Sequence, residues 1–443
     1  MKGVKVNELE RIVKMQKEGE SRGICSICSS SPFVIDAGII QAVRTGSHVL
    51  IEATANQVNQ MGGYTGMKPA DFRDLVLSRA DALGLDRDKV ILGGDHLGPV
   101  AWKKMDPDKA MDLAEELVYE FSRAGYTKIH LDASMPLGNE VTLTTEEIAD
   151  RTVRLCRTAE KGASEYAEEH EDARMPVYVI GSEVPTPGGS GEEDALAVTR
   201  PEDLTGMIGC FGEKFAEAGL AEAGVSSAWN RVIAAVVQPG VEFGNEQIHD
   251  YVPEEAAELI KTAKEIPGVV LEGHSTDYQK RENLKKMVDD GIAVLKVGPA
   301  LTFAAREALF ALSHIEDELA KAGRLEGREP SCFIETLDKA MTDDPSNWKD
   351  HYTQDEPESS FMRKYSYSDR SRYYMTVPEV KAALDKLIVN LEAAGMPLTL
   401  VSQYLPEQYR KIKEGAIGSS PEELITDRVC SVLDDYWYAC GLI

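Results

Sequence analysis

Eight short apolar runs, each followed by a stretch with helical periodicity, constrain the fold of this chain more than any other feature. The runs span residues 23–29, 48–54, 90–96, 128–134, 177–183, 231–240, 268–275 and 293–300. The helical stretches span residues 32–43, 69–82, 108–123, 144–161, 201–218, 253–263, 279–289 and 301–319. This alternation predicts an α/β fold, a (β/α)8 TIM barrel, with a doubly wound open sheet as the competing fold. We favour the barrel because each run carries polar or small groups near its C-terminal end, as strands around one site require.

The character of the sequence changes after about Gly323. The polar breaker GRLEGREP leads into helical stretches and an aromatic, polar segment between Trp348 and Tyr374. We therefore expect two parts: a barrel with an N-terminal helix over residues 1–323, and a helical C-terminal extension over residues 324–443. In the extension, SYSDRSRYYM (residues 366–375) could form a lid or a subunit contact, although its aromatic residues more often belong to a core.

Composition narrows the class of protein. A formal net charge of −27, from 75 acidic and 48 basic residues, argues against a surface for nucleic acid or an anionic membrane. The chain has no apolar window of about eighteen residues, and its charged N-terminus lacks the apolar core of a signal peptide. Seven scattered cysteines, with a single CxxC at Cys25 and Cys28, are expected to be reduced. These features favour a cytoplasmic enzyme that acts on a small molecule.

Polar residues at the ends of the predicted strands would meet around one volume in a barrel. They are Asp95, His96, Asp132, Glu183, Gln238, Glu242, His274 and Asp277. Mixed imidazole and carboxylate ligation suits a divalent metal such as zinc, manganese or nickel. We predict His96, Glu183 and His274 as the ligands. Asp132, Gln238 and Glu242 are reserve ligands or the acceptors that orient the imidazoles.

Each candidate also has a structural interpretation. A lone histidine is commonly a structural hydrogen-bonding group, and Asp132 could simply cap a loop. We set aside five histidines on that ground: His48, His170, His249, His314 and His351. Lys296 could form a Schiff base with a ketose. In that reaction the carboxylates and imidazoles at the strand ends would have no common function. We therefore rank metal-dependent chemistry above a Schiff base. The glycine-rich loop over residues 186–194 and the loops GHSTD and KVGPALT are weak signals of anion binding.

Several motifs resemble one family closely. They are IEATANQVNQMGGYTGM, ILGGDHLGP, KIHLDASM, YVIGSEVPTPGG, VVQPGVEFGN, EGHSTDYQ, LKVGPALTFAAREALFAL, SDRSRYY and VSQYLPEQY. From about residue 10 to the C-terminus, the chain is similar to the accessory, "non-catalytic" subunits of class II tagatose-bisphosphate aldolase. That resemblance implies a TIM barrel and a possible class II aldolase partner. It also implies kinship with metal-dependent ketose 4-epimerases.

A more distant resemblance to the catalytic class II aldolases implies individual roles. Asp95 resembles their acid/base and His96 a zinc ligand, while Asp132 resembles the Asp of their next strand. Further residues that match are Glu183 with Gly188 and Gly189, and a metal-binding His274 followed by the phosphate-binding Ser275. On the sixth strand those enzymes supply another metal-binding histidine, whereas this chain has QPGVEFG. That departure leaves Gln238 or Glu242 to substitute for the imidazole.

We therefore expect a metal-dependent epimerase that inverts C4 of a ketohexose or its phosphate by retro-aldol and aldol chemistry. Asp95 or Glu183, with Asp132 as a further candidate, would move the proton of the C4 hydroxyl. The expected substrate-binding residues are Asn56, Gly188, Gly189, Ser275, Asp277 and Lys296, with a mobile loop over residues 57–67. The alternative is a non-catalytic subunit that stabilises and activates a class II tagatose-1,6-bisphosphate aldolase. We expect a homo-oligomer in either case.

Overall fold

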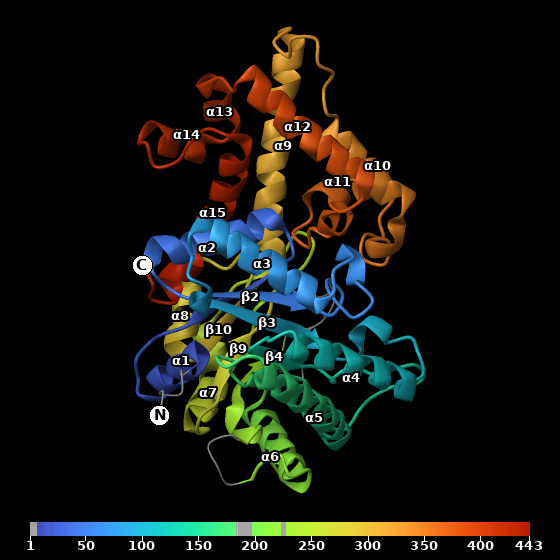
Figure 1. Ribbon diagram of the computed structural model, residues 1–443, viewed down its shortest axis with the longest axis vertical. Coiled ribbons are helices and arrows are strands. Elements are labelled where there is room, and N and C mark those ends of the chain that lie inside the picture. Colours follow the sequence, from blue (N-terminus) through green and yellow to red (C-terminus); the bar gives the residue numbers. More distant parts are fainter. Residues whose placement is uncertain (1–6, 183, 185–196, 223–226) are drawn as a thin grey trace.

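The computed structural model describes residues 7–182, 184, 197–222 and 227–443. Within them, eight parallel strands form a closed barrel in the order β1-β10-β9-β6-β5-β4-β3-β2 (Figure 1). The strands are β1 (Ile24–Cys28), β2 (Val49–Thr54), β3 (Val90–Leu97), β4 (Lys128–Leu131), β5 (Val177–Ile180), β6 (Val232–Val237), β9 (Val270–Gly273) and β10 (Ile292–Val297). The predicted TIM barrel is confirmed, and each predicted apolar run overlaps one barrel strand. A small antiparallel pair, β7 (Glu242–Phe243) and β8 (Ile248–His249), follows β6.

Helices between the strands surround the barrel. They are α2 (Pro32–Thr45), α3 (Pro69–Leu83), α4 (Pro107–Arg123), α5 (Thr145–Glu169), α6 (Pro201–Glu217), α7 (Pro253–Glu265) and α8 (Arg281–Asp290). Proline occupies the first turn of α2, α3, α4, α6 and α7, where its missing N–H costs no intrahelical hydrogen bond. No helix in the described part of the chain is both long enough and apolar enough to cross a membrane.

The N-terminal helix α1 (Glu8–Lys17) closes one end of the barrel. Asn7 caps it in a capping box with Glu10. Its apolar face, Leu9, Ile12 and Val13, packs into one buried cluster with strand residues that include Leu50 and Ile91 near the strand N-termini. The opposite end, where the strands finish, is thereby left as the open face of the barrel.

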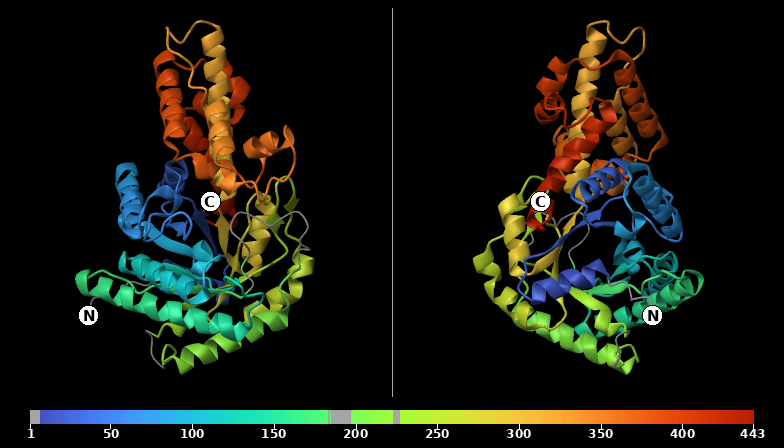
Figure 2. Two further views of the ribbon diagram at one scale, coloured as in Figure 1. Left: turned by 90° about the vertical axis from the view of Figure 1, so that its right-hand side faces the viewer. Right: turned by 60° about the vertical axis from the view of Figure 1, so that its left-hand side comes forward.

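The eighth position in the ring of helices is filled from the end of the chain. Helix α9 (Pro299–Lys321) follows β10 but rises away from the barrel, as Figures 1 and 2 show. Helix α15 (Pro421–Ala439) packs against α8 on one side and α2 on the other. Trp437, 1% exposed, is its largest anchor and donates from Nε1 to Thr45 Oγ1 and Ser47 Oγ at 3.3 Å each.

The remaining helices pack around the upper part of α9 (Figure 2). They are α10 (Phe333–Asp343), α11 (Glu358–Tyr365), α12 (Pro378–Ala394), α13 (Leu398–Tyr404) and α14 (Pro406–Lys413), with a short 3-10 helix, η6 (Arg370–Tyr374), that returns to the barrel. The predicted C-terminal helices are therefore present. Since α9 lies on one side of residue 323 and packs against α12 and α15 on the other, the two parts share one apolar core.

Candidate functional site

A layer of charged side chains fills the barrel interior below its open end. Glu52 on β2, Lys128 on β4 and Glu272 on β9 are each 0% exposed. Lys128 Nζ lies 2.7 Å from Glu52 Oε1 and 2.8 Å from Glu272 Oε2. Gly93 on β3 makes room for this layer, because a Cβ there would lie 2.6 Å from Glu52 Cγ. Charged side chains are tolerated in a protein interior only when they are paired, and the ion pairs of Lys128 with both carboxylates meet that requirement.

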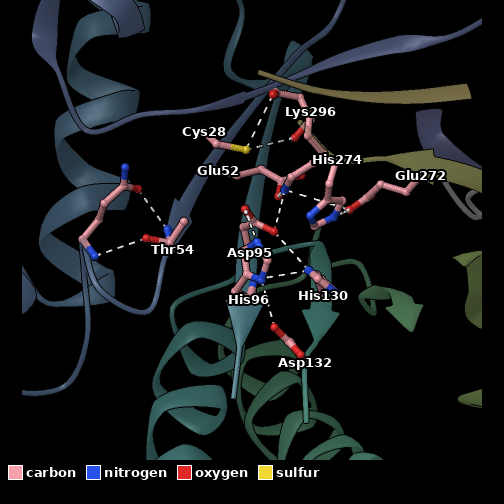
Figure 3. Close-up of polar contacts among 12 residues, drawn as sticks. Cys28, Glu52, Thr54, Asp95, His96, His130, Asp132, Glu272, His274 and Lys296 are labelled. Atoms are coloured by element: carbon pink, nitrogen blue, oxygen red, sulfur yellow. Dashed lines mark hydrogen bonds and ion pairs between the residues drawn. The ribbon is translucent and has the colours of Figure 1, made fainter. Parts of the chain in front are cut away.

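Lys296 on β10 joins this layer to the predicted site. Its Nζ lies 2.7 Å from Glu52 Oε2 and 2.6 Å from Asp95 Oδ1 (Figure 3). Burial alone would lower the pKa of Lys296, but Asp95 and the other neighbouring anionic groups hold that pKa well above its usual range. A Schiff-base nucleophile must be a neutral amine. The charge environment of Lys296 therefore supports a structural ammonium over that chemistry.

Three imidazoles converge above the charged layer. The ring centroids of His96, His130 and His274 lie 5.0 to 5.2 Å apart. A carboxylate accompanies each ring: His96 Nδ1 lies 2.8 Å from Asp132 Oδ2, His130 Nδ1 lies 3.0 Å from Asp95 Oδ1, and His274 Nε2 lies 3.0 Å from Glu272 Oε1 (Figure 3). Carboxylate partners of this kind fix the orientation and tautomer of metal-binding histidines.

His130 was not among the predicted site residues. It occupies β4 between Lys128 and Asp132, and in a strand alternate residues point to the same face. Polar residues at 128, 130 and 132 of the run KIHLDAS were the available signal. Charges inside the runs HVLIEAT and GVVLEGHS gave the same signal for Glu52 and Glu272. Apolarity dominated those runs, so the inward-facing polar positions were missed.

The buried donor set suits a divalent metal. One ligand atom from each of Asp95, His130, Glu272 and His274 lies within 4.8 Å of the others. His130 Nε2 is buried and has no hydrogen-bond partner among the described residues. His130 Nδ1 lies 3.0 Å from Asp95 Oδ1 and also accepts a hydrogen bond from the backbone N–H of His96 at 3.2 Å, so the tautomer of His130 decides which ring nitrogen carries the lone pair. The residues present therefore fit a metal ion. The third imidazole of the site comes from His130 on β4, whereas we predicted that Gln238 or Glu242, after the sixth strand, would take the place of a metal-binding histidine.

Charges around the donor set determine its protonation. Burial raises the pKa of Asp95, but the charges of His96 and Lys296 outweigh it and hold that pKa well below the usual range. Burial lowers the pKa of His274 to about 4, despite its hydrogen bond to Glu272. An ionised Asp95 and a neutral His274 are the forms that bind metal ions.

The other predicted ligands lie in different surroundings. Glu183, Gly188 and Gly189 lie outside the described residues. Gln238 Oε1 accepts hydrogen bonds from the backbone N–H groups of Gly240 at 2.9 Å and Val241 at 3.0 Å, so the side chain closes a turn after β6. Glu242 is 3% exposed on β7 and is not part of the four-residue donor set. His96 lies beside that set, and its assignment as a ligand stays a prediction.

A pocket with about 660 Å³ of empty space, partly open to solvent, lies above this cluster. Seven predicted site residues line it: Asn56, Asp95, His96, His274, Ser275, Asp277 and Lys296. Asp132 lies below, accepting from Ser134 N–H and Oγ–H. His96 and Ser275 adopt left-handed backbone angles, with φ of 48° and 52°. Strained conformations of this kind in non-glycine residues cluster at functional sites.

Asp277 occupies the helix N-terminus that faces the pocket. Its Oδ1 accepts from Gly298 N–H at 3.0 Å and Ala300 N–H at 2.8 Å, at the start of α9. Burial raises the pKa of Asp277 to about 6, although these hydrogen bonds oppose the shift. A helix N-terminus with free N–H groups attracts phosphate, but here a carboxylate of the chain itself already fills this position.

The C-terminal extension supplies part of the pocket wall. Arg372 and Tyr373, both on η6, line the pocket opposite the barrel. Tyr373 meets Tyr64 of the loop over residues 57–67 edge-on, with ring centroids 4.9 Å apart. Arg372 Nη2 donates to Tyr373 Oη at 2.9 Å. The segment SYSDRSRYYM thus brings the extension to the mouth of the barrel, while its Tyr374 is buried in the core.

Comparison with known proteins gives one consistent family. A family model described as D-tagatose-1,6-bisphosphate aldolase subunit GatZ/KbaZ-like matches residues 9–441. The chain is 44% identical to the D-tagatose-1,6-bisphosphate aldolase subunit GatZ of Salmonella dublin over 434 residues, covering 98% of this chain and 99% of that protein. It is also 44% identical to the GatZ subunit of Escherichia coli O9:H4 over 435 residues, covering 98% and 100%.

A solved structure agrees with these relatives. The crystal structure of a probable tagatose 6 phosphate kinase from Sinorhizobium meliloti 1021 is 42% identical in sequence and superposes with a TM-score of 0.84. The match covers 95% of this chain and 100% of that one. The whole architecture, with barrel and extension together, is therefore shared.

Proposed function

This chain belongs to the D-tagatose-1,6-bisphosphate aldolase subunit GatZ/KbaZ-like family, and we propose that it acts as a subunit that supports a class II tagatose-1,6-bisphosphate aldolase. The observation that carries this proposal is identity of 44% to GatZ subunits over essentially the full length of both chains. Our expectation from sequence gave first place to a 4-epimerase. The comparisons favour the alternative, because the relatives are named as aldolase subunits.

Co-expression tests this function directly. The chain would be produced with and without a catalytic class II tagatose-bisphosphate aldolase, and the half-life of aldolase activity would be measured at fixed aldolase concentration. We expect the half-life to lengthen at least several-fold and the two chains to co-purify. An unchanged half-life with no co-purification would remove the subunit proposal.

A second candidate, a metal-dependent 4-epimerase of ketohexoses or their phosphates, is favoured by one specific observation. The buried set of Asp95, His130, Glu272 and His274 contains an imidazole nitrogen, Nε2 of His130, without a hydrogen-bond partner in the described part of the chain. A purely supporting subunit has no use for such costly buried groups. When bound there, a divalent ion would supply Lewis-acid polarisation of a substrate carbonyl.

The chain's own residues would perform the other tasks of that reaction. Asp95 lines the pocket as an ionised carboxylate and would accept the proton of a sugar hydroxyl as a weak base, since the charges of His96 and Lys296 hold its pKa well below the usual range. Asn56, Ser275 and Arg372 line the pocket and would hold the remaining hydroxyls. The contact between Tyr64 and Tyr373 would keep bulk water away from the cleaved fragments.

An isomer assay separates the two candidates. The purified chain, without any aldolase, would be loaded with zinc, manganese or nickel and incubated with tagatose, fructose and their 6-phosphates. Interconversion at C4 that disappears after chelation supports the epimerase. If no interconversion occurs under any of these conditions, the epimerase candidate is excluded and the subunit function is the candidate that remains.

A further inference from the structure

A second cavity lies between the barrel and the extension. It has about 1410 Å³ of empty space, partly open, bounded by the start of α2, the middle of α3, the first half of α9, η6 and α12. Most of the wall is apolar, with contributions from Phe33, Met67, Leu75, Leu309, Met375 and Leu384. A sugar would leave its hydroxyl groups unpaired against such a wall. The cavity therefore suits a ligand with an apolar body.

One cation in this wall lacks acceptors for its N–H groups. Arg306 is 2% exposed and lines the cavity. Its Nε and Nη2 are buried and have no hydrogen-bond partner within the described chain. The guanidinium carbon lies 4.1 Å from the ring centroid of Phe303 and 5.0 Å from that of Phe310. Aromatic rings stabilise the charge but do not replace hydrogen-bond acceptors in the guanidinium plane.

The nearest carboxylate, that of Asp369, only partly neutralises the charge of Arg306. Arg306 Nε lies 3.6 Å from Asp369 Oδ1, beyond hydrogen-bond distance. Asp369 instead accepts hydrogen bonds from Thr302 and Ser371. The neighbouring cations already have partners: Arg372 donates to Ser368 O, Asp369 O and Tyr373 Oη, and Lys381 Nζ lies 3.1 Å from Asp385 Oδ2. Among the described cations that line the cavity, Arg306 is thus the one with buried N–H groups, on Nε and Nη2, that make no hydrogen bond.

The start of α2 faces the same cavity. Ser29, Ser30 and Ser31 line it, and the N-cap Ser31 makes no side-chain capping hydrogen bond to the 14-residue helix. Pro32 has no N–H, and the N–H groups of Val34 and Ile35 donate to Ser31 O at 3.1 and 3.0 Å, so this helix start contributes mainly the partial positive charge of the helix dipole. Two independent features of the wall, the buried guanidinium and the helix start, therefore favour an anion.

We propose that this cavity is a binding site for an organic carboxylate with an apolar body, whose carboxylate pairs with Arg306 and whose body lies against Leu309 and Leu384. A single guanidinium fork matches one carboxylate in geometry and charge. A phosphate dianion would need a second open cation. Cys28, Gln57, Tyr64 and Arg372 line both this cavity and the barrel pocket, so a ligand here would touch residues that shape that pocket.

Calorimetric titration of the full chain with 4-phenylbutanoate tests the proposal. We expect saturable binding that weakens at least tenfold in Arg306→Met, whereas Arg328→Met, a change of an exposed arginine in the extension, leaves it unaltered. Two reference ligands separate the contribution of the carboxylate from that of the apolar body. 4-Phenylbutan-1-ol has no charge, and phenyl phosphate carries a phosphate in place of the carboxylate. Equal affinity for the alcohol, or preference for phenyl phosphate, would overturn the carboxylate assignment.

Two more variants keep the test decisive if Arg306→Met does not fold. Leu309→Trp retains Arg306 but fills the cavity, and it should abolish binding. His274→Ala alters only the barrel pocket and should leave binding unchanged. Binding that survives Leu309→Trp, binding lost in His274→Ala, or no binding to the wild-type chain at millimolar ligand would each overturn the proposal.

Discussion

Lys296 Nζ lies 2.6 Å from Asp95 Oδ1 in the barrel interior, and both residues are less than 5% exposed. The ion pair connects a charged layer, in which Lys128 lies between Glu52 and Glu272, to the three imidazoles above it. Each charge in this series balances its neighbours at short range. Removal of any one member therefore leaves another charge buried without a partner, and the first prediction follows from this arrangement.

Lys296→Met should lower the free energy of unfolding by about 3–5 kcal/mol, because the carboxylates of Asp95 and Glu52 lose a buried partner. Denaturant titration followed by circular dichroism measures the change. Lys285→Met removes a surface ion pair with Asp289 and serves as the control, with an expected loss below about 1 kcal/mol. Equal losses in the two variants would contradict a buried, interdependent charge layer.

His130→Ala and His274→Ala should each reduce bound zinc or manganese at least tenfold, since each removes one donor from the four-residue set. Elemental analysis of dialysed protein gives the metal content. His170→Ala, at the exposed end of α5, should retain the wild-type content. If His130→Ala keeps its metal, the donor set inferred from the geometry is wrong, and His96 with His274 becomes the alternative pair.

Asp277→Asn should change how stability depends on pH. The folded-state pKa of Asp277 is raised to about 6 by burial, so between about pH 4 and pH 6 the unfolded chain binds fewer protons at this group than the folded chain. The contribution of Asp277 to stability therefore falls as pH rises through that window, by about 1.4 kcal/mol per pH unit. Asn keeps an acceptor for Gly298 and Ala300 but does not titrate.

Unfolding free energies of wild type and Asp277→Asn, measured at pH 4, 5, 6 and 7, test this slope. Their difference should move in favour of the Asn variant up to pH 6 and then stay constant. A difference that is the same at pH 4 and pH 7 would show that Asp277 titrates alike in both states.

Trp437→Ala should lower the free energy of unfolding by about 3–5 kcal/mol, because a large buried side chain is lost between α15 and the barrel. Tyr438→Ala is the matched control one residue further along the same helix, where the side chain is 40% exposed. Thermal and denaturant unfolding should show a single transition for wild type. Retention of wild-type stability in Trp437→Ala would mean that α15 is not part of the barrel's core.

The barrel itself could be predicted because strand-length apolar runs and helical stretches alternate without a break. The order of the outer helices could not. Periodicity predicted a helix after β10, and α9 is indeed there, but nothing local distinguishes a helix that lies along the barrel from one that leaves it. That choice depends on α15, which competes for the same groove between α2 and α8 from more than 120 residues away in sequence.

The site was predictable where a polar residue ends a strand and obscure where it lies within one. Asp95, His96 and His274 stand beside glycines at strand ends, and the pocket brings them together. His130 and Lys128 lie inside an apolar run, where the average character of the run hides them. Arg372 comes from the extension and reaches the pocket only through tertiary packing, so no local pattern reveals it.

The position of α15 also affects the order in which this protein can fold during synthesis. A barrel with seven of its outer helices would leave the groove between α2 and α8 exposed until residues 421–439 emerge from the ribosome. The residues that precede 421 must therefore wait, with an apolar groove uncovered, for this helix. Short deletions within residues 421–439 should cause aggregation of the nascent chain rather than a local defect.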